Sequence, residues 1–176
     1  MSDHDVNEAG VLRLKVGRSL RALGSDLDML DEAVAGHAGI HRTDLRCLEI
    51  VAREGPVSAG RLAGLAGLST SAVTSVIDRA ERAGRMRRVR DGADRRRVMV
   101  EVTAVARQEG RAAFAGLMEG TQRLLARYSP AELRLLDEFL DSVRALVIEQ
   151  AAARSARERP EPAARGAAGG GLGGPR

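Results

Sequence analysis

The stretch that decides the fold spans residues 58–103 and reads SAGRLAGLAGLSTSAVTSVIDRAERAGRMRRVRDGADRRRVMVEVT. Its first half predicts two short helices joined by a tight turn that contains Gly67. Ser58 and Ser69 precede these helices, where a hydroxyl can accept a hydrogen bond from a free backbone N–H group and cap the helix. Two short helices around such a turn form a helix-turn-helix at about residues 58–83, whose second helix enters the DNA major groove.

The second half of the stretch changes period and predicts a β-hairpin. Gly84 ends the preceding helix, and valines then alternate with other side chains over residues 97–102, as in a strand. Residues 86–90 predict a first strand, and Asp91-Gly92 is a strong signal for the turn between the two. We call the hairpin at about residues 86–102 the wing.

The arginines of the chain gather on the wing. Residues 85–97 contain seven arginines and two aspartates, a net charge of +5, whereas the whole chain carries +4. A GC-rich genome also enriches arginine, so the sequence pI of about 10.4 alone indicates no partner, but codon bias does not explain the clustering. A basic hairpin beside a groove-reading helix indicates binding to double-stranded DNA, and a solvated charged hairpin is the alternative.

The second helix of the helix-turn-helix has two unlike faces. Its apolar stripe, which we expect in the core, consists of Val73, Val76, Ile77 and Ala80. The opposite side carries Thr70, Ser71, Thr74, Ser75, Asp78 and Arg79. Small hydroxyl side chains let a helix lie close to base edges and phosphates. The alternative is an ordinary solvated face, which would usually contain more Glu and Lys.

Longer helices are predicted on both sides of this stretch. Apolar residues recur every three or four positions over residues 5–35, and a shorter pattern covers residues 43–53. Thr103 is placed to cap a helix that reaches about residue 127, and Ser129-Pro130-Ala131-Glu132 is a capping box that begins the last helix. The predicted fold class is mainly α with a small β-hairpin wing. The apolar stripes of the long helices exceed what one small domain can cover, so we expect a homodimer.

The same residues resemble the core of MarR-type (multiple antibiotic resistance) transcriptional regulators, which are winged helix-turn-helix proteins. Asp94-Arg95-Arg96, followed by a strand and the helix-opening Thr103, is the most specific part, and the pattern ending in Glu81-Arg82-Ala83-Gly84 is the second. The resemblance covers about residues 8–150. It implies a winged-helix DNA-binding part at about 43–102 and dimerisation helices at 8–35 and 104–150.

The resemblance also implies DNA-binding roles for individual side chains. Those of the recognition helix are Ser69, Thr70, Ser71, Thr74, Ser75 and Arg79, and those of the wing are Arg88, Asp94, Arg95 and Arg96. The hydroxyl residues would face the major groove, and Arg79 and Arg88 would approach phosphates. Arg95 would enter the minor groove, while Asp94 would pair with Arg96 and hold the tip in shape. For Asp94, a plain turn residue is the alternative.

The sequence departs from the family pattern at three places. Arg85 stands where the family usually has a hydrophobic residue that enters the wing, and Arg61 stands where an acidic residue is common. Ala104-Val105-Ala106 replaces the usual Pro and Gly after the threonine. These departures affect the detailed geometry of the wing and leave the fold prediction unchanged.

The function predicted from these features is transcriptional regulation. We expect a homodimer that binds a pseudo-palindromic operator and represses by covering a promoter. The resemblance implies that a small aromatic or anionic effector binds between the dimerisation and DNA-binding parts and weakens DNA binding. The competing hypothesis is a winged-helix module that binds a protein or a ligand without reading DNA. That module would carry acidic or apolar replacements in the wing and the recognition helix.

Other features of the sequence exclude several classes of protein. No catalytic constellation and no phosphate-cradling glycine loop is present, so we expect no enzyme activity, no cofactor and no metal. Cys47 is predicted as a buried thiol, and His37 and His41 as part of a polar segment near the effector cleft. The N-terminal residues lack signal-peptide features and no apolar run reaches about 20 residues, so a cytoplasmic location without a membrane is expected. Residues 154–176 are predicted as a disordered tail.

Overall fold

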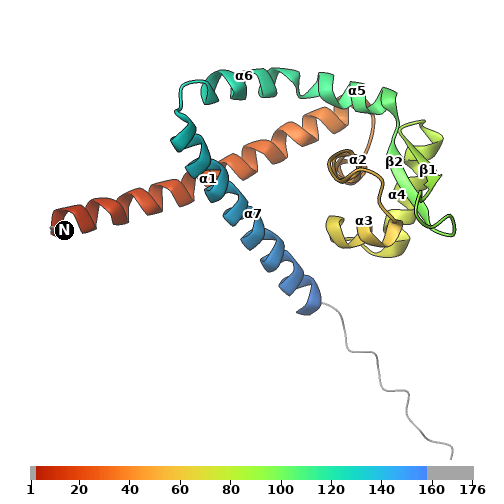
Figure 1. The fold of residues 1–176 in the computed structure, drawn as a ribbon, viewed down its shortest axis with the longest axis horizontal. Coiled ribbons are helices and arrows are strands. Elements are labelled where there is room, and N and C mark those ends of the chain that lie inside the picture. The colour runs from red at the N-terminus through yellow and green to blue at the C-terminus, as the bar shows by residue number, and fades with distance from the viewer. Residues whose placement is uncertain (1–2, 158–176) are drawn as a thin grey trace, which may run out of the picture. The chain divides into compact units, whose positions relative to one another are not determined.

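The computed structural model describes residues 3–157, with side chains at 7–154, and divides into two compact units, Met1–Leu124 and Leu125–Arg176 (Figure 1). The helices and strands of the first unit are α1 (Asp3–Ala38), α2 (Arg42–Glu54), α3 (Ala59–Ala66), α4 (Thr70–Arg82), β1 (Met86–Arg90), β2 (Val98–Val102), α5 (Ala104–Ala113) and α6 (Ala115–Leu125). Helix α6 ends one residue beyond the boundary of this unit. The second unit contains α7 (Pro130–Arg157). The mainly α fold with a two-stranded wing is confirmed.

A hydrophobic core lies among α2, α3, α4 and the hairpin. The predicted inward face of α4 is buried, since Val73, Val76, Ile77 and Ala80 are all 5% exposed or less. They pack with side chains from α2, from α3 and from both strands. Each fully buried valine or isoleucine contributes about 1.5–3 kcal/mol relative to an exposed one, so this core fixes how α4 sits on the domain.

Local capping interactions set the ends of the helix-turn-helix as predicted. The Ser58 Oγ accepts a hydrogen bond from the Arg61 N–H at 3.2 Å, and the Ser69 Oγ accepts one from the Ala72 N–H at 3.2 Å. Gly67 adopts a φ of 64°, a left-handed conformation that only glycine reaches without strain. The turn from Gly67 to Ser69 therefore fixes the angle between α3 and α4.

The wing is an antiparallel hairpin whose register runs from Met86 opposite Val102 to Arg90 opposite Val98. Its second strand begins at Val98, one residue later than predicted. Val57, which precedes α3, adds a bridge to Val100 through N–H···O=C bonds of 3.1 and 2.7 Å. This bridge joins the hairpin to the segment between α2 and α3.

Two predicted helices differ from the structure in their boundaries. The helix predicted from residue 104 to about residue 127 is interrupted at Phe114, which has a φ of −103° and a ψ of 6°. Gly110 and Gly116 flank the break, and glycine costs about 1 kcal/mol relative to alanine in a helix. The first helix ends at Ala38 before the left-handed Gly39, so it continues past the predicted end.

The second unit opens on the predicted capping box, which is confirmed in both directions. The Ser129 N–H donates to Glu132 Oε2 at 2.8 Å, and the Glu132 N–H donates to Ser129 Oγ at 3.3 Å. Hydrogen bonds from the Ser129 backbone N–H and, as the smaller contribution, from the Ser129 hydroxyl hold the pKa of Glu132 below its ordinary value. The last helix continues to Arg157, so residues 154–157 are helical instead of disordered, and residues 158–176 lie outside the described residues.

Both long helices carry exposed apolar side chains. On α1 the exposed residues of the predicted stripe are Leu12, Val16, Leu23 and Leu27, and on α7 they include Leu140 and Val147. Within residues 3–157, no helix combines the length and the apolar character needed to cross a membrane.

Candidate nucleic-acid interface

The outer face of α4 carries a shallow row of hydroxyl groups. Ser69, Thr70, Ser71, Thr74 and Ser75 are all exposed. The Thr74 Oγ1 donates to the Thr70 carbonyl at 2.9 Å, and the Ser75 Oγ donates to the Ser71 carbonyl at 3.1 Å. The hydroxyls of Ser69 and Ser71 lie 3.0 Å apart and are hydrogen bonded. These bonds hold the short side chains against their own helix, so that a large partner can approach the backbone of α4 closely.

Arg79, which is predicted to approach a phosphate, binds a carboxylate of α2. Its Nε donates to Asp44 Oδ2 at 3.0 Å and its Nη2 donates to Asp44 Oδ1 at 2.6 Å. The side chain of Asp44 is only 8% exposed, whereas that of Arg79 is 41% exposed. Because Asp44 lies on α2 and Arg79 on α4, this bidentate pair joins the two helices. It also supplies hydrogen bonds to a carboxylate that is buried.

Arg88, which is predicted to approach a phosphate, also has carboxylate partners within the chain. Its Nη2 donates to Asp78 Oδ1 at 2.5 Å, and its Nη1 pairs with Glu81 Oε2. The Arg88 backbone N–H donates to Glu81 Oε1 at 3.2 Å. Because Arg88 lies on β1 and both carboxylates lie on α4, the three side chains join the wing to the recognition helix. We call them the Arg88 clamp.

The tip of the wing is shaped by backbone hydrogen bonds. The Asp94 carboxylate accepts from the Arg96 N–H at 3.0 Å, and the Asp94 carbonyl accepts from the Arg97 N–H at 2.9 Å. The contact that joins Asp94 to Arg96 is therefore made by the Arg96 backbone N–H, and it agrees with the alternative that Asp94 is a turn residue. The aspartate instead forms an Asx-type turn, which a short carboxylate stabilises by binding an N–H two residues further on. Asp91 does the same with the Ala93 N–H at 2.8 Å.

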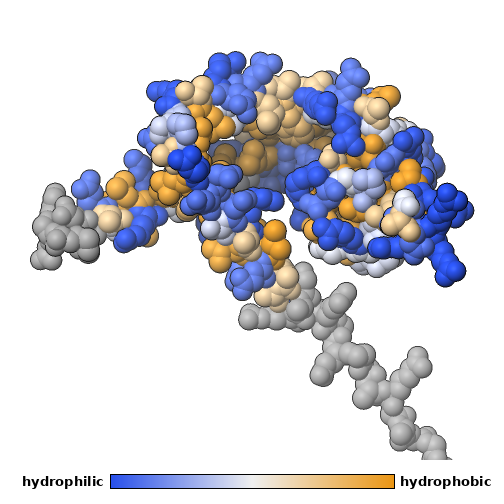
Figure 2. All heavy atoms as spheres, viewed as in Figure 1, coloured by the Kyte–Doolittle hydropathy of each residue, from blue (hydrophilic) through white to orange (hydrophobic). Residues whose placement is uncertain are grey.

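Arg95 and Arg96 present exposed side chains at this tip. Within residues 7–154, no carboxylate lies within ion-pair distance of either guanidinium. Figure 2 shows hydrophilic residues gathered over the hairpin at the right edge of the view. The tip therefore offers two positive charges without an ion-pair partner among residues 7–154.

Sequence reasoning missed Asp44, Asp78 and Glu81 as partners of the predicted arginines. Asp44 is the one charged residue that is buried in the described part of the chain. Its signal in the sequence was its position beside Leu45 in the first turn of α2, where it faces the core. The other two carboxylates could not be paired with Arg88 from spacing, because the pairing depends on how the hairpin folds back on α4.

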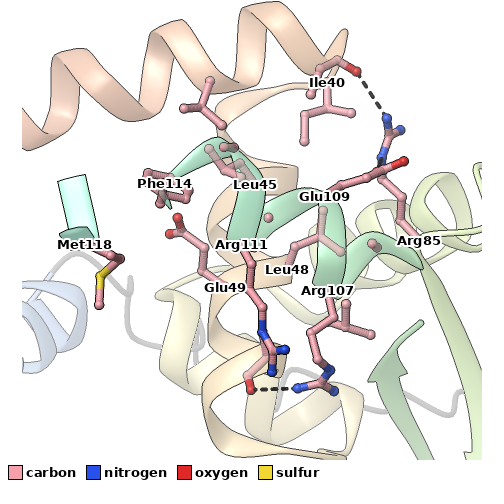
Figure 3. A pocket seen from close by; sticks show the side chains of 17 residues that line it. Ile40, Leu45, Leu48, Glu49, Arg85, Arg107, Glu109, Arg111, Phe114 and Met118 are labelled. Carbon is pink, nitrogen blue, oxygen red and sulfur yellow. Dashed lines mark hydrogen bonds and ion pairs between the residues drawn. The ribbon is translucent and has the colours of Figure 1, made fainter. Parts of the chain in front are cut away.

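A cavity of about 580 Å³ lies among the C-terminal end of α1, α2, α5 and the start of α6 (Figure 3). Its wall is largely apolar and includes Val34, Ile40, Leu45, Leu48, Phe114 and Met118. The charged residues that line it are Glu49, Arg85, Arg107, Glu109 and Arg111. His37 and His41 are exposed and are not among its lining residues, whereas Ala38 and Ile40 of the same segment are.

The charged groups of the cavity are unevenly paired. Arg107 Nη1 donates to the Ala52 carbonyl at 3.4 Å, and Arg85 Nη2 donates to the Ala38 carbonyl at 3.2 Å. Glu49 is half-buried, and burial raises its pKa above the ordinary value, with the charge of Asp31 adding to the effect. The cavity thus combines an apolar wall with several polar groups, as small-molecule sites commonly do.

Cys47 is fully buried in the core, as predicted. Burial raises the pKa of its thiol, and the nearby charge of Asp44 raises it further. A thiol in this state is a small hydrophobic residue instead of a reactive nucleophile.

Comparisons with known proteins place the chain in a family. A model of the MarR family matches residues 40–98. The uncharacterized HTH-type transcriptional regulator YcgE of Bacillus subtilis (strain 168) is 34% identical over 130 residues, which are 74% of this chain and 84% of the relative.

Solved structures agree in fold. A MarR family protein from Bacillus stearothermophilus is similar with a TM-score of 0.58 and 20% identity, over 84% of this chain and 98% of that one. NadR in complex with 4-hydroxyphenylacetate is similar with a TM-score of 0.56 and 20% identity, over 73% of this chain and 91% of that one. Together with its wing and helix-turn-helix, the identity to YcgE establishes that the chain belongs to the MarR family of transcriptional regulators.

Proposed function

We propose that this regulator represses transcription as a homodimer that binds a pseudo-palindromic operator and releases it when a small aromatic or anionic effector binds. The observation that carries the proposal is the surface formed by two neighbouring elements. The hydroxyl face of α4 lies next to a wing whose tip exposes the unpaired Arg95 and Arg96. One element has the shape for the major groove and the other has the charge for the minor groove.

Each side chain has a distinct role in this proposal. Ser69, Thr70, Ser71, Thr74 and Ser75 contact bases and phosphates from the major groove. Arg95 enters the minor groove and Arg96 binds a phosphate near it. Arg79 holds α4 against Asp44 and turns its remaining N–H groups toward the phosphate backbone. Arg88 and Asp94 keep the wing in the orientation that these contacts require.

Dimer formation is supported by the apolar side chains that the long helices expose. Leu23 on α1 is 50% exposed and Val147 on α7 is 62% exposed. Soluble monomers rarely leave large apolar patches open to water, so a second copy of the chain is the natural cover. A two-fold pair would present two copies of α4 about one DNA turn apart, which matches two half-sites.

Effector binding is supported by the cavity beneath α5. Its volume of about 580 Å³ lies within the range of small-molecule sites. Arginines on its wall suit an anionic group and Phe114 suits an aromatic ring. NadR, which has the same fold, was solved with the aromatic carboxylate 4-hydroxyphenylacetate.

The test is a binding titration with fluorescent duplex DNA from the promoter next to the coding region. We expect affinity to fall steeply with salt, because phosphate contacts release counterions. Arg95→Ala and Arg96→Ala should each weaken binding about tenfold and lower the log–log salt slope by about one. Arg53→Ala, which removes the same charge from the end of α2, should change neither quantity. Absence of binding to duplex DNA at low ionic strength would exclude the proposal and favour a winged-helix module that does not bind DNA.

A further inference from the structure

Arg82, the last residue of α4, lies on the same side of the helix as the hydroxyl row. It follows Ser75 by about two helical turns and Ser71 by about three, so the three side chains fall on one line along the helix. The opposite face of α4 is buried in the core, whereas Arg82 is exposed. Arg82 therefore extends the hydroxyl row to the C-terminal end of α4.

The guanidinium of Arg82 is only partly used within the protein. Its Nε donates to the Asp78 carbonyl at 3.1 Å, which holds the side chain back along α4. Among residues 7–154, no carboxylate lies within ion-pair distance of Arg82, and neither Nη group has a hydrogen-bond acceptor. Two parallel N–H donors thus remain, an arrangement that matches two oxygens of a phosphate.

This lack of an ion pair depends on the Arg88 clamp. Asp78 precedes Arg82 by four positions, and an acid four residues before an arginine is the favourable arrangement for an ion pair on a helix. Glu81 is the adjacent residue. Arg88 of the wing binds both carboxylates instead, through its two Nη atoms. The clamp therefore takes from Arg82 the partners that the helix itself would offer.

The length of α4 indicates which part of DNA Arg82 reaches. The helix has 13 residues, and at 1.5 Å per residue it is about 20 Å long. The major groove is about 12 Å wide, and recognition helices place their N-terminal residues against the base edges. With the hydroxyl row of α4 in the groove, the far end of the helix extends to the sugar-phosphate backbone at its border.

We propose that Arg82 binds a DNA phosphate at the border of the major groove, and that the Arg88 clamp keeps its guanidinium available for this contact. The inference rests on the proposed function, because it adds a ligand for the same DNA at the far end of α4. Phosphates are identical in every sequence, so the contact raises the affinity for any duplex and adds no base preference.

The first experiment compares a fluorescent duplex from the neighbouring promoter with a scrambled duplex of equal length, over a series of salt concentrations. Arg82→Ala should weaken binding to both duplexes by the same factor, about tenfold. It should also lower the log–log salt slope by about one for each bound recognition helix. Arg82→Lys should keep the slope, because it keeps the charge. Arg53→Ala is the control and should change neither quantity, and thermal unfolding checks that each variant folds.

The second experiment locates the phosphate. Duplexes in which one phosphate at a time is replaced by an uncharged methylphosphonate are titrated with the wild type and with Arg82→Ala. At one phosphate of each half-site, the replacement should weaken binding of the wild type and have no further effect on the variant. A variant that only distorts α4 would instead lose affinity by the same factor at every replaced phosphate.

The role of the clamp is tested by repeating the substitution in two further backgrounds. In Arg88→Ala the carboxylates of Asp78 and Glu81 can pair with Arg82, so Arg82→Ala should there weaken binding by less than about twofold. When Asp78→Asn and Glu81→Gln are added to Arg88→Ala, the loss caused by Arg82→Ala should return to about tenfold.

Three results would overturn the inference. A loss confined to the promoter duplex, with an unchanged salt slope, would make Arg82 a base-reading residue. Unchanged affinity of a folded Arg82→Ala variant would remove Arg82 from the interface, and an equal loss in all three backgrounds would remove the clamp from its role. Failure of the proposed function would look different, because the wild type would then bind neither duplex at low ionic strength.

Discussion

At the scale of single residues, the stability of the domain depends on whether a charge is buried. Asp44 and Asp28 make a matched pair for testing this, because each binds an arginine whose side chain is 41% exposed. The carboxylate of Asp44 is 8% exposed and that of Asp28 is 66% exposed. Water can replace the arginine at the second site but not at the first.

We therefore expect Asp44→Ala to lower the free energy of unfolding by about 1–3 kcal/mol, because it leaves Arg79 without its acceptor next to the core. Asp28→Ala should change it by less than about 1 kcal/mol, as is usual for exposed ion pairs. Urea denaturation followed by circular dichroism gives both values. Equal losses in the two variants would show that burial of Asp44 is irrelevant to stability.

A double-mutant cycle on the Arg88 clamp distinguishes whether Arg88 positions the wing or binds a DNA phosphate directly. If Arg88 acts through Asp78 and Glu81, Arg88→Ala should weaken DNA binding in the wild type but change it by less than about twofold when Asp78→Asn and Glu81→Gln are already present. The affinities of the four proteins for operator DNA form the cycle. A phosphate ligand would instead lose the same factor in both backgrounds, and that result would restore the role first inferred from the sequence.

The buried thiol of Cys47 predicts a dependence of stability on pH. Because burial raises its pKa, the folded state keeps the proton at pH values where the unfolded chain releases it. Stability should be unaffected by this group below the ordinary thiol pKa of 9.0 and should fall as pH rises above it. Cys47→Ala should lack that part of the decline when urea midpoints are compared between pH 8 and pH 10. Parallel declines in both proteins would contradict the prediction.

At the scale of elements, the turn between α3 and α4 provides a test in which two similar substitutions have opposite effects. Gly67 has a φ of 64°, whereas Gly64 lies inside α3 in a helical conformation. An added Cβ meets no other atom within 4 Å at either position. Gly67→Ala should lower stability by about 1–2 kcal/mol through backbone strain, and Gly64→Ala should raise it by up to about 1 kcal/mol. The melting temperatures of the two variants should move in opposite directions.

Element boundaries were predictable from the sequence wherever a local signal sets them. Ser58, Ser69 and Ser129 cap the helices that follow them, and Gly67 and Gly84 end helices in left-handed conformations. Each signal acts over three or four residues, so it can be recognised in the printed sequence. The break at Phe114 had no such signal, because an aromatic residue is tolerated in a helix interior.

The candidate site was predictable as a surface but not as a set of contacts. The exposure of the hydroxyl row follows from the period of α4, whose opposite face is apolar. The partners of Arg79 and Arg88 depend on distances between elements that only the tertiary fold defines. For Asp94 the sequence left an ion pair and a turn role open, and the tertiary structure shows the backbone N–H two residues away as the donor.

At the scale of the whole molecule, the exposed stripe of α1 predicts the oligomeric state. Leu23 belongs to the stripe and Leu14 lies on the opposite face of the same helix, and both are exposed in the single chain. Leu23→Glu should convert the proposed dimer to a monomer and weaken binding to the proposed operator, because one chain presents only one recognition helix. Leu14→Glu should leave the dimer intact. Sedimentation equilibrium distinguishes the two states, and a dimeric Leu23→Glu variant would remove α1 from the interface.

The hydrogen bonds within α4 have a consequence for the operator itself. Thr74 and Ser75 direct their only hydroxyl hydrogens to carbonyls of their own helix, so each presents oxygen lone pairs outward. In the major groove, adenine and cytosine display exocyclic amino groups, whereas guanine displays the acceptors O6 and N7. In the operator that we propose, guanine, and thymine with its acceptor O4, should therefore be disfavoured opposite these two side chains, and both proposed half-sites should repeat that bias.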